Sequence, residues 1–212
     1  DRAIAYREHQ GFAHELVALS AGIQKMVRSD IGASGVLFTL DTESGFRDVV
    51  MITAAYGLGE NVVQGAVDVD EFLVHKPRFR DGHRALVRRV LGAKQMKMVY
   101  AGGRTREAVV NRPTSDEERG RFCVTDDQVL TLADYAIKIE DHYSRHHGHT
   151  TPMDIEWALD GVDGELYIVQ ARPETVQSRR GGAVLRSWHL EPHAAEEITS
   201  GRALSRKVMA VA

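Results

Sequence analysis

Pro152-Met-Asp-Ile-Glu-Trp-Ala-Leu-Asp-Gly-Val-Asp-Gly-Glu-Leu-Tyr-Ile-Val-Gln-Ala-Arg-Pro173 has the pattern of a β-hairpin. Apolar and polar residues alternate along its first arm. This alternation places Met153, Ile155 and Trp157 on one face of a strand. The acidic residues Asp154 and Glu156 then point together from the opposite face. Two carboxylates on one exposed face are an arrangement that can serve a binding site.

The second arm alternates in the same way and carries two polar residues of interest, Gln170 and Arg172. Regular alternation predicts one face formed by Leu166, Ile168, Gln170 and Arg172. The opposite face is then formed by Tyr167, Val169 and Ala171. Turn residues between the arms come from Asp160-Gly161 and Asp163-Gly164.

The length of the connection decides whether the two polar sets meet. A connection with an odd number of residues, either 161–163 or 160–164, sets Asp154 opposite Gln170 and Glu156 opposite Ile168. Asp154, Glu156, Gln170 and Arg172 then share one face. Their oxygens suit Mg²⁺ and the guanidinium suits phosphate, so the face fits a metal-bound polyphosphate. An even-length connection puts the two sets on opposite faces. The alternative that stays open is an ordinary hairpin with one solvent-exposed face, on which Glu and Arg pair across the strands.

Bulk composition indicates a globular protein. The chain has 212 residues, 43% of them hydrophobic, enough for one sizeable core. Its net charge of −3 argues against partners held by bulk electrostatics, such as nucleic acid or a membrane surface. The single cysteine, Cys123, fits a reducing compartment, and no apolar run reaches the roughly 20 residues of a membrane span. We therefore expect a cytoplasmic protein. Both ends look cut, since the chain starts at Asp1 rather than Met and ends without a closing element.

The remaining patterns predict mixed elements joined by turns. We expect a helix over 1–20 broken at Gly11 and strands over 22–28, 35–40, 48–56 and 71–76, the third of these buried and central. A turn over 41–47 precedes that central strand. A hairpin is expected over 97–101 and 104–110, with Gly102-Gly103 as a two-residue turn, followed by a polar loop over 111–120.

The clearest helix runs from Thr125 to His147. Thr125 and Gln128 have capping-box spacing, apolar residues recur with helical period, and Gly148 is suited to end the helix. Together the elements predict an α+β fold: a mostly antiparallel sheet backed by this helix.

Three weaker signals each have two readings. The glycines of Gly57-Leu58-Gly59 precede a short helical pattern, so they serve either a phosphate or an ordinary turn. Four arginines, Arg80, Arg84, Arg88 and Arg89, form either a polyphosphate-facing patch or, as favoured here, a solvated face. His142 and His146, near Glu140 and His149, have the spacing of a zinc site, but cationic residues at a helix C-terminus are the favoured reading.

Three segments together resemble one family. They are 22–30 (GIQKMVRSD), 56–65 (YGLGENVVQG) and the hairpin pair 153–157 (MDIEW) with 168–173 (IVQARP). In this order and spacing they are similar to the phosphoenolpyruvate synthases (pyruvate–water dikinases) and pyruvate–phosphate dikinases, over roughly the first 180 residues. The resemblance implies an ATP-grasp fold, with 1–178 as the C-terminal lobe of its nucleotide domain. Residues 179–212 would be a linker and the start of a phosphohistidine domain.

The resemblance also implies an activity and roles for named residues. The family converts pyruvate, ATP and water to phosphoenolpyruvate, AMP and phosphate through a phosphohistidine on another domain, with Mg²⁺ and ATP as cofactors. Glu156 and Gln170 match metal ligands, and Arg172 matches the catalytic arginine that stabilises phosphate charge during transfer. Nucleotide contacts are implied for these three and for Gln24, Met26, Glu60 and Asp154.

The resemblance implies as well what this stretch lacks. The first lobe and the phosphohistidine motif would lie outside it, so we expect it to be inactive alone. Pyruvate would bind on another domain, and the full-length enzyme is implied to be a homo-oligomer. Two alternatives stay open: the nucleotide lobe of an antibiotic (rifampin-type) phosphotransferase, and a non-catalytic docking module with the same fold.

Overall fold

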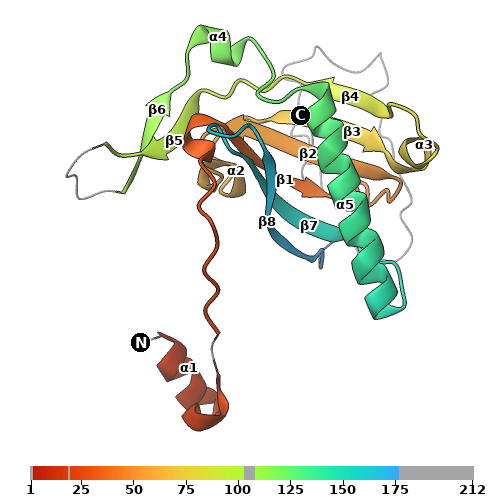
Figure 1. Ribbon diagram of the computed structural model, residues 1–212. Helices are drawn as coiled ribbons and strands as arrows, with labels where there is room; N and C mark the ends of the chain where they lie inside the picture. The colour runs from red at the N-terminus through yellow and green to blue at the C-terminus, as the bar shows by residue number, and fades with distance from the viewer. Residues whose placement is uncertain (1, 19, 103–107, 177–212) are drawn as a thin grey trace, which may run out of the picture.

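A six-stranded antiparallel sheet forms the centre of the computed structural model, which describes residues 2–18, 20–102 and 108–176 (Figure 1). The strand order is β4-β3-β2-β1-β7-β8. The strands are β1 (Ala33–Phe38), β2 (Val49–Tyr56), β3 (Asp70–His75), β4 (Leu86–Val90), β7 (Met153–Leu159) and β8 (Leu166–Pro173), with β5 (Met96–Tyr100) and β6 (Val109–Pro113) as a separate hairpin. The helices are α1 (Arg2–Gln10), α2 (Glu60–Val63), α3 (Lys76–Arg80), α4 (Asp116–Arg119) and α5 (Asp126–His147), with 3₁₀ turns η1 (His14–Leu16) and η2 (Ser29–Ile31). The α+β prediction is confirmed.

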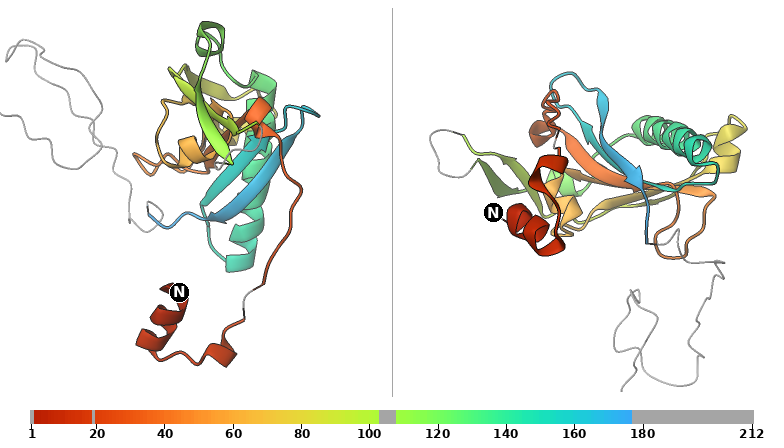
Figure 2. Two further views of the ribbon diagram at one scale, coloured as in Figure 1. Left: turned by 90° about the vertical axis from the view of Figure 1, so that its left-hand side faces the viewer. Right: turned by 90° about the horizontal axis from the view of Figure 1, so that it is seen from below.

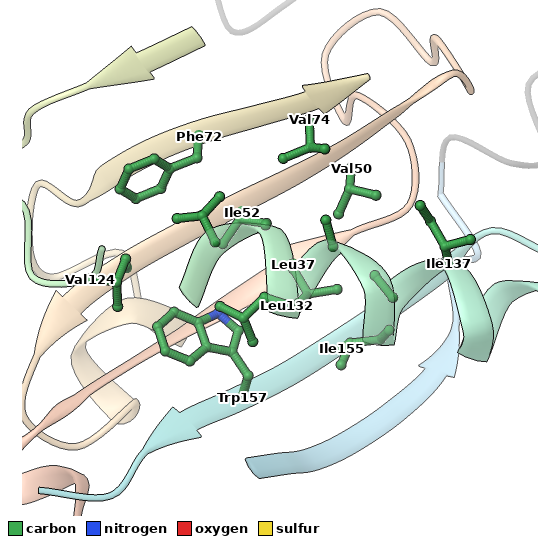
Figure 3. Packing of buried hydrophobic residues seen from close by; sticks show 14 of the residues in the cluster. Leu37, Val50, Ile52, Phe72, Val74, Val124, Leu132, Ile137, Ile155 and Trp157 are labelled. Carbon is green, nitrogen blue, oxygen red and sulfur yellow. The ribbon is translucent and has the colours of Figure 1, made fainter. Parts of the chain in front are cut away.

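One face of the sheet is covered by α5, and the core lies between them (Figures 2 and 3). Helix residues at three- and four-residue spacing turn toward the sheet, and Val129, Leu132 and Ala136 are fully buried. They meet side chains from the inner face of the strands, including Leu37, Val50, Ile52, Phe72, Val74, Ile155 and Trp157. The predicted central strand is confirmed as β2, which is buried along most of its length.

The ends of α5 match the sequence pattern. The Thr125 hydroxyl accepts a hydrogen bond from the Gln128 N–H, and the Gln128 side-chain oxygen accepts one from the Thr125 N–H, so the capping box is present. Gly148 takes the left-handed conformation at φ 73° and ends the helix. Within the residues that the structure describes, no helix is both long and apolar enough to cross a membrane.

A buried ion pair fastens α5 to the ends of inner strands of the sheet. Lys76 Nζ lies 2.7 Å from Glu140 Oε2 and donates a second bond of 2.8 Å to the Thr39 carbonyl oxygen. The Thr39 hydroxyl donates to Glu140 and accepts from the N–H of Met153, the first residue of β7. The start of α3, helix α5, the residue after β1 and the start of β7 are therefore joined by one satisfied polar cluster.

A second buried pair lies at the other end of β3. The side chains of Lys94 and Asp70 are fully buried, with Lys94 Nζ 2.5 Å from Asp70 Oδ1. Asp70 also accepts the backbone N–H groups of Gly92 and Cys123. Burial and the neighbouring Asp70 carboxylate raise the pKa of the Cys123 thiol well above its usual range.

Several local predictions are corrected. Residues 22–28 form no ladder with any described strand, so the strand predicted there is wrong; side-chain and backbone contacts hold the segment beside the β7–β8 hairpin instead. The loop predicted over 111–120 contains the end of β6 and α4, since Ser115 and Glu118 form a capping box. Tyr100 pairs with Val109, so a two-residue turn at 102–103 is also wrong. Residues 103–107 and the predicted linker and domain start over 179–212 lie outside the described residues.

The N-terminal prediction is confirmed in part. Helix α1 ends at Gln10, and Gly11 at φ 70° breaks the pattern as expected. The helix buries no residue of its own. The favoured reading of the arginines also gains support, because Arg80, Arg84 and Arg89 pair with acidic residues of α5.

Glu140→Ala tests the buried pair. Removing the carboxylate leaves the Lys76 ammonium buried without its counter-charge, so we expect the free energy of unfolding to fall by about 3–5 kcal/mol. Urea titration followed by circular dichroism measures it. The exposed pair Asp134–Lys138 on the same helix provides the control, and Asp134→Ala should change stability by less than about 0.5 kcal/mol. Equal effects of the two substitutions would contradict the role given to Glu140.

Candidate functional site

A cleft of about 690 Å³ lies on the sheet face opposite α5. Its walls come from four parts of the chain that are distant in sequence: the extended segment 24–29, the start of β1, the turn leading into α2, and the β7–β8 hairpin. Tyr100 at the end of β5 closes one side. A volume of this size suits a drug-sized or nucleotide-sized ligand.

The β7–β8 hairpin contains a β-bulge that the sequence pattern does not reveal. Near its open end, Asp154 pairs with Arg172 and Glu156 with Gln170. The register then shifts, and Trp157 pairs with Ile168, which leaves Val169 as the extra residue of β8. The predicted pairs Asp154–Gln170 and Glu156–Ile168 are therefore wrong.

The bulge nevertheless brings the four polar residues to one face. Leu159 pairs with Leu166, so the connection over 160–165 has an even number of residues, and regular pairing would separate the two polar sets. The extra residue at Val169 shifts the pairing by one position, so Gln170 and Arg172 return to the face of Asp154 and Glu156. It also reverses the predicted faces beyond it, because Leu166 and Ile168 pack toward the core with Ala171. Tyr167, opposite Ala158, now shares the face of Glu156.

The predicted site residues fall into two neighbouring groups. Gln24, Met26, Glu60 and Glu156 line the cleft directly. Asp154, Gln170 and Arg172 continue the same face of the hairpin beyond the cleft lining. The seven residues come from three elements. The extended segment supplies Gln24 and Met26, α2 supplies Glu60, and the bulged hairpin supplies the other four.

Asp154 and Arg172 form an ion pair across the two strands. Arg172 Nε donates to Asp154 Oδ2 at 2.9 Å, and a terminal nitrogen lies 2.7 Å from the same oxygen. The hydrogen bond and the charge of Asp154 raise the pKa of Arg172. Because 65% of the arginine side chain remains exposed, its other donors are available to a phosphate.

The donor set at the hairpin fits a hard cation. Glu156 offers carboxylate oxygens and its partner Gln170 an amide oxygen, and Mg²⁺ prefers one or two such ligands together with water and phosphate oxygens. In the part of the chain that the structure describes, no three His, Cys, Asp or Glu side chains gather as a metal centre. Glu140, near His142 and His146, is already bonded to Lys76 and Thr39.

Among the residues of the cleft wall that sequence reasoning missed are Lys25, Tyr100 and Tyr167. Tyr167 was assigned to the wrong face because alternation cannot detect a bulge. Tyr100 belongs to a hairpin that packs on the cleft only in three dimensions, where its hydroxyl donates to the Met26 sulfur at 3.0 Å. No signal in the sequence links Lys25 to the hairpin turn 138 residues away.

The glycine turn before α2 has a structural role. Gly57 has φ 88°. Its N–H donates to the Gly32 carbonyl oxygen, and its own carbonyl oxygen accepts from the Ser34 hydroxyl. A Cβ at this position would lie 2.5 Å from the Met98 carbonyl oxygen. Gly57 thus lets β5 approach the sheet and bring Tyr100 to the cleft.

Comparison with known proteins identifies similar sequences. The family model described as the pyruvate phosphate dikinase AMP/ATP-binding domain matches residues 1–187. The chain is 55% identical to the phosphoenolpyruvate synthase of Pseudomonas aeruginosa, over 98% of this chain and 26% of that protein. It is 51% identical to that of Escherichia coli, over 98% of this chain and 25% of that protein. It is 41% identical to that of Pyrococcus furiosus, over 82% of this chain and 20% of that protein. The chain thus spans about a quarter of the length of the first two.

Gly57→Ala tests the close approach at the turn. Positive φ alone costs about 1–2 kcal/mol for alanine. The clash with Met98 adds to this cost, so we expect a loss of more than about 2 kcal/mol together with looser packing of β5. Gly65→Ala is the control, since Gly65 also has positive φ, at 66°, but open space around its Cβ. Thermal unfolding of both variants measures the difference. Equal melting temperatures would show that Met98 does not constrain this turn.

Proposed function

Because this chain belongs to the pyruvate phosphate dikinase AMP/ATP-binding domain family, we propose that its cleft binds ATP together with Mg²⁺ and serves phosphoryl transfer in a phosphoenolpyruvate-forming enzyme. The observation that carries the proposal is the bulged hairpin, which sets Glu156 beside Gln170 and Asp154 beside Arg172 on one face. A structural hairpin needs no such face. The ATP-grasp description implied by the sequence resemblance is part of the same proposal.

Each residue of this face has a distinct task in the proposal. Glu156 and Gln170 would hold Mg²⁺, which, when bound, neutralises charge on the phosphate oxygens. Arg172 acts as the catalytic arginine by donating hydrogen bonds to the phosphates, while Asp154 keeps the guanidinium oriented toward them. Gln24, Met26 and Glu60 line the cleft and would make the remaining contacts with the nucleotide. Catalysis of this kind is mainly positioning and charge stabilisation.

Conversion of pyruvate, ATP and water to phosphoenolpyruvate, AMP and phosphate is a proposal for the whole protein. This chain spans about a quarter of its curated relatives, and the proposal places the phosphorylated histidine and the pyruvate site outside its 212 residues. We therefore expect these 212 residues alone to form no phosphohistidine. Incubation with labelled ATP, followed by detection of acid-labile label, measures this, and a labelled chain would refute it. A cytoplasmic location and a homo-oligomeric full-length enzyme belong to the same proposal.

Glu156→Gln tests the metal face. The substitution keeps the side chain's size but removes the negative charge that faces the cation, so we expect Mg-ATP to bind at least about tenfold more weakly. Isothermal titration calorimetry of the chain with Mg-ATP measures the affinity. Glu165→Gln is the matched control, because Glu165 is exposed in the turn of the same hairpin. Unchanged affinity in Glu156→Gln would exclude Glu156 as a ligand.

A further inference from the structure

Lys25 joins the extended segment to the tip of the β7–β8 hairpin. Its Nζ lies 3.1 Å from the Tyr167 hydroxyl, 3.3 Å from Asp163 Oδ2 and 5.0 Å from the centre of the Tyr167 ring. The Tyr167 hydroxyl donates to the same Asp163 oxygen at 2.8 Å. Lys25, Asp163 and Tyr167 thus form a closed triangle of polar contacts, which we call the clasp.

A second anchor holds the same segment three residues later. The N–H of Arg28 donates to Asp160 Oδ2, and the N–H of Gly161 donates to the Arg28 carbonyl oxygen. Both anchors end on the one hairpin turn. Residues 24–27, which include the first anchor and precede the second, line the cleft, yet they pair with no described strand. The position of this wall therefore depends on a few side-chain and backbone contacts at the turn rather than on a sheet ladder.

The end of the cleft beside the clasp is apolar and aromatic. Met26, Val27, Tyr100, Tyr167 and Ile168 line it. The Asp154–Arg172 pair lies four residues farther along β7 from Ala158, or about 13 Å at the rise of a strand. A planar heterocycle suits the aromatic end, whereas phosphates suit the charged end.

We propose that Lys25 is a positioning residue: the clasp fixes the 24–27 wall against β8 and so sets the affinity of the cleft for the base-bearing half of the nucleotide. This inference rests on the proposed nucleotide function. In keeping with the geometry, hydrogen bonds from Tyr167 and Asp163 raise the pKa of Lys25, and the pKa of Asp163 is lowered by the Glu165 N–H, Tyr167 and Lys25.

The binding test separates positioning from direct contact with phosphate. Lys25→Met, Asp163→Asn and the double variant are titrated with adenosine and with Mg-ATP. Loss of the clasp should weaken both ligands by the same factor, about tenfold, as for one charge-assisted hydrogen bond. The loss in the double variant should be clearly smaller than the sum of the two single losses, because the Lys25–Asp163 contact is already absent from each single variant. Lys25→Arg should retain most of the affinity. Lys138→Met is the control, because the Lys138 side chain is exposed on α5, and its affinity should match that of the parent chain.

Other outcomes overturn the proposal. A loss confined to Mg-ATP and to Lys25→Met would mean that Lys25 touches phosphate directly. Additive losses in the double variant would mean that Lys25 and Asp163 act separately.

A second measurement does not depend on nucleotide binding. The Lys25 side chain is 65% exposed, but the clasp ties its segment to the hairpin, and a protease cuts most readily where the backbone can open locally. Asp163→Asn should therefore speed cleavage after Lys25 relative to cleavage after Arg7 in α1. Mass spectrometry follows both cuts. If the parent chain binds neither ligand, the proposed function fails, while this cleavage ratio still decides whether the clasp holds the segment. An unchanged ratio would overturn the clasp.

Discussion

The β7–β8 hairpin must bury one face and present the other to solvent, and a single extra residue allows it to do both. Along most of β7 the inner residues, such as Ile155 and Trp157, pack into the core beneath α5. If β8 continued in regular register from Leu166, Gln170 and Arg172 would turn into that core. Burying a guanidinium without a partner costs several kcal/mol, far more than leaving one bulged residue partly unpaired. The bulge at Val169 resolves the conflict and turns both side chains toward Asp154 and Glu156.

The rest of the fold keeps this hairpin in place. Strand β1 pairs with β7 from Asp154 to Leu159. Gly35 of β1 leaves room for its neighbours, because a Cβ there would lie 1.8 Å from the Thr53 carbonyl oxygen and 2.9 Å from the Trp157 ring. The Lys76–Glu140–Thr39 cluster fastens the start of β7 to α5. Since the core side of the sheet is fixed in this way, the opposite side can carry a cleft whose walls are loops, a short helix and a separate hairpin.

The cleft and the hairpin face beyond it differ in character. Aromatic and apolar side chains line the cleft beside the hairpin turn, whereas Asp154, Gln170 and Arg172 lie on the same face of the hairpin beyond the cleft lining. This arrangement suits a ligand that has a planar apolar part and a charged part. Family membership, shown by the match over residues 1–187, points to the same kind of ligand by an independent route.

The sequence by itself determined the features that depend on neighbours along the chain. The caps and buried stripe of α5, the buried strand β2 and the acidic pair of β7 follow from local periodicity and side-chain chemistry, so they were predicted correctly. The tertiary structure alone decided the hairpin register, because a bulge is selected by the cost of burying Gln170 and Arg172 and leaves no trace in the alternation itself. It also decided that residues 22–28 stay unpaired and that Lys25 meets Tyr167, since contacts between residues more than a hundred positions apart depend on how the chain folds back on itself.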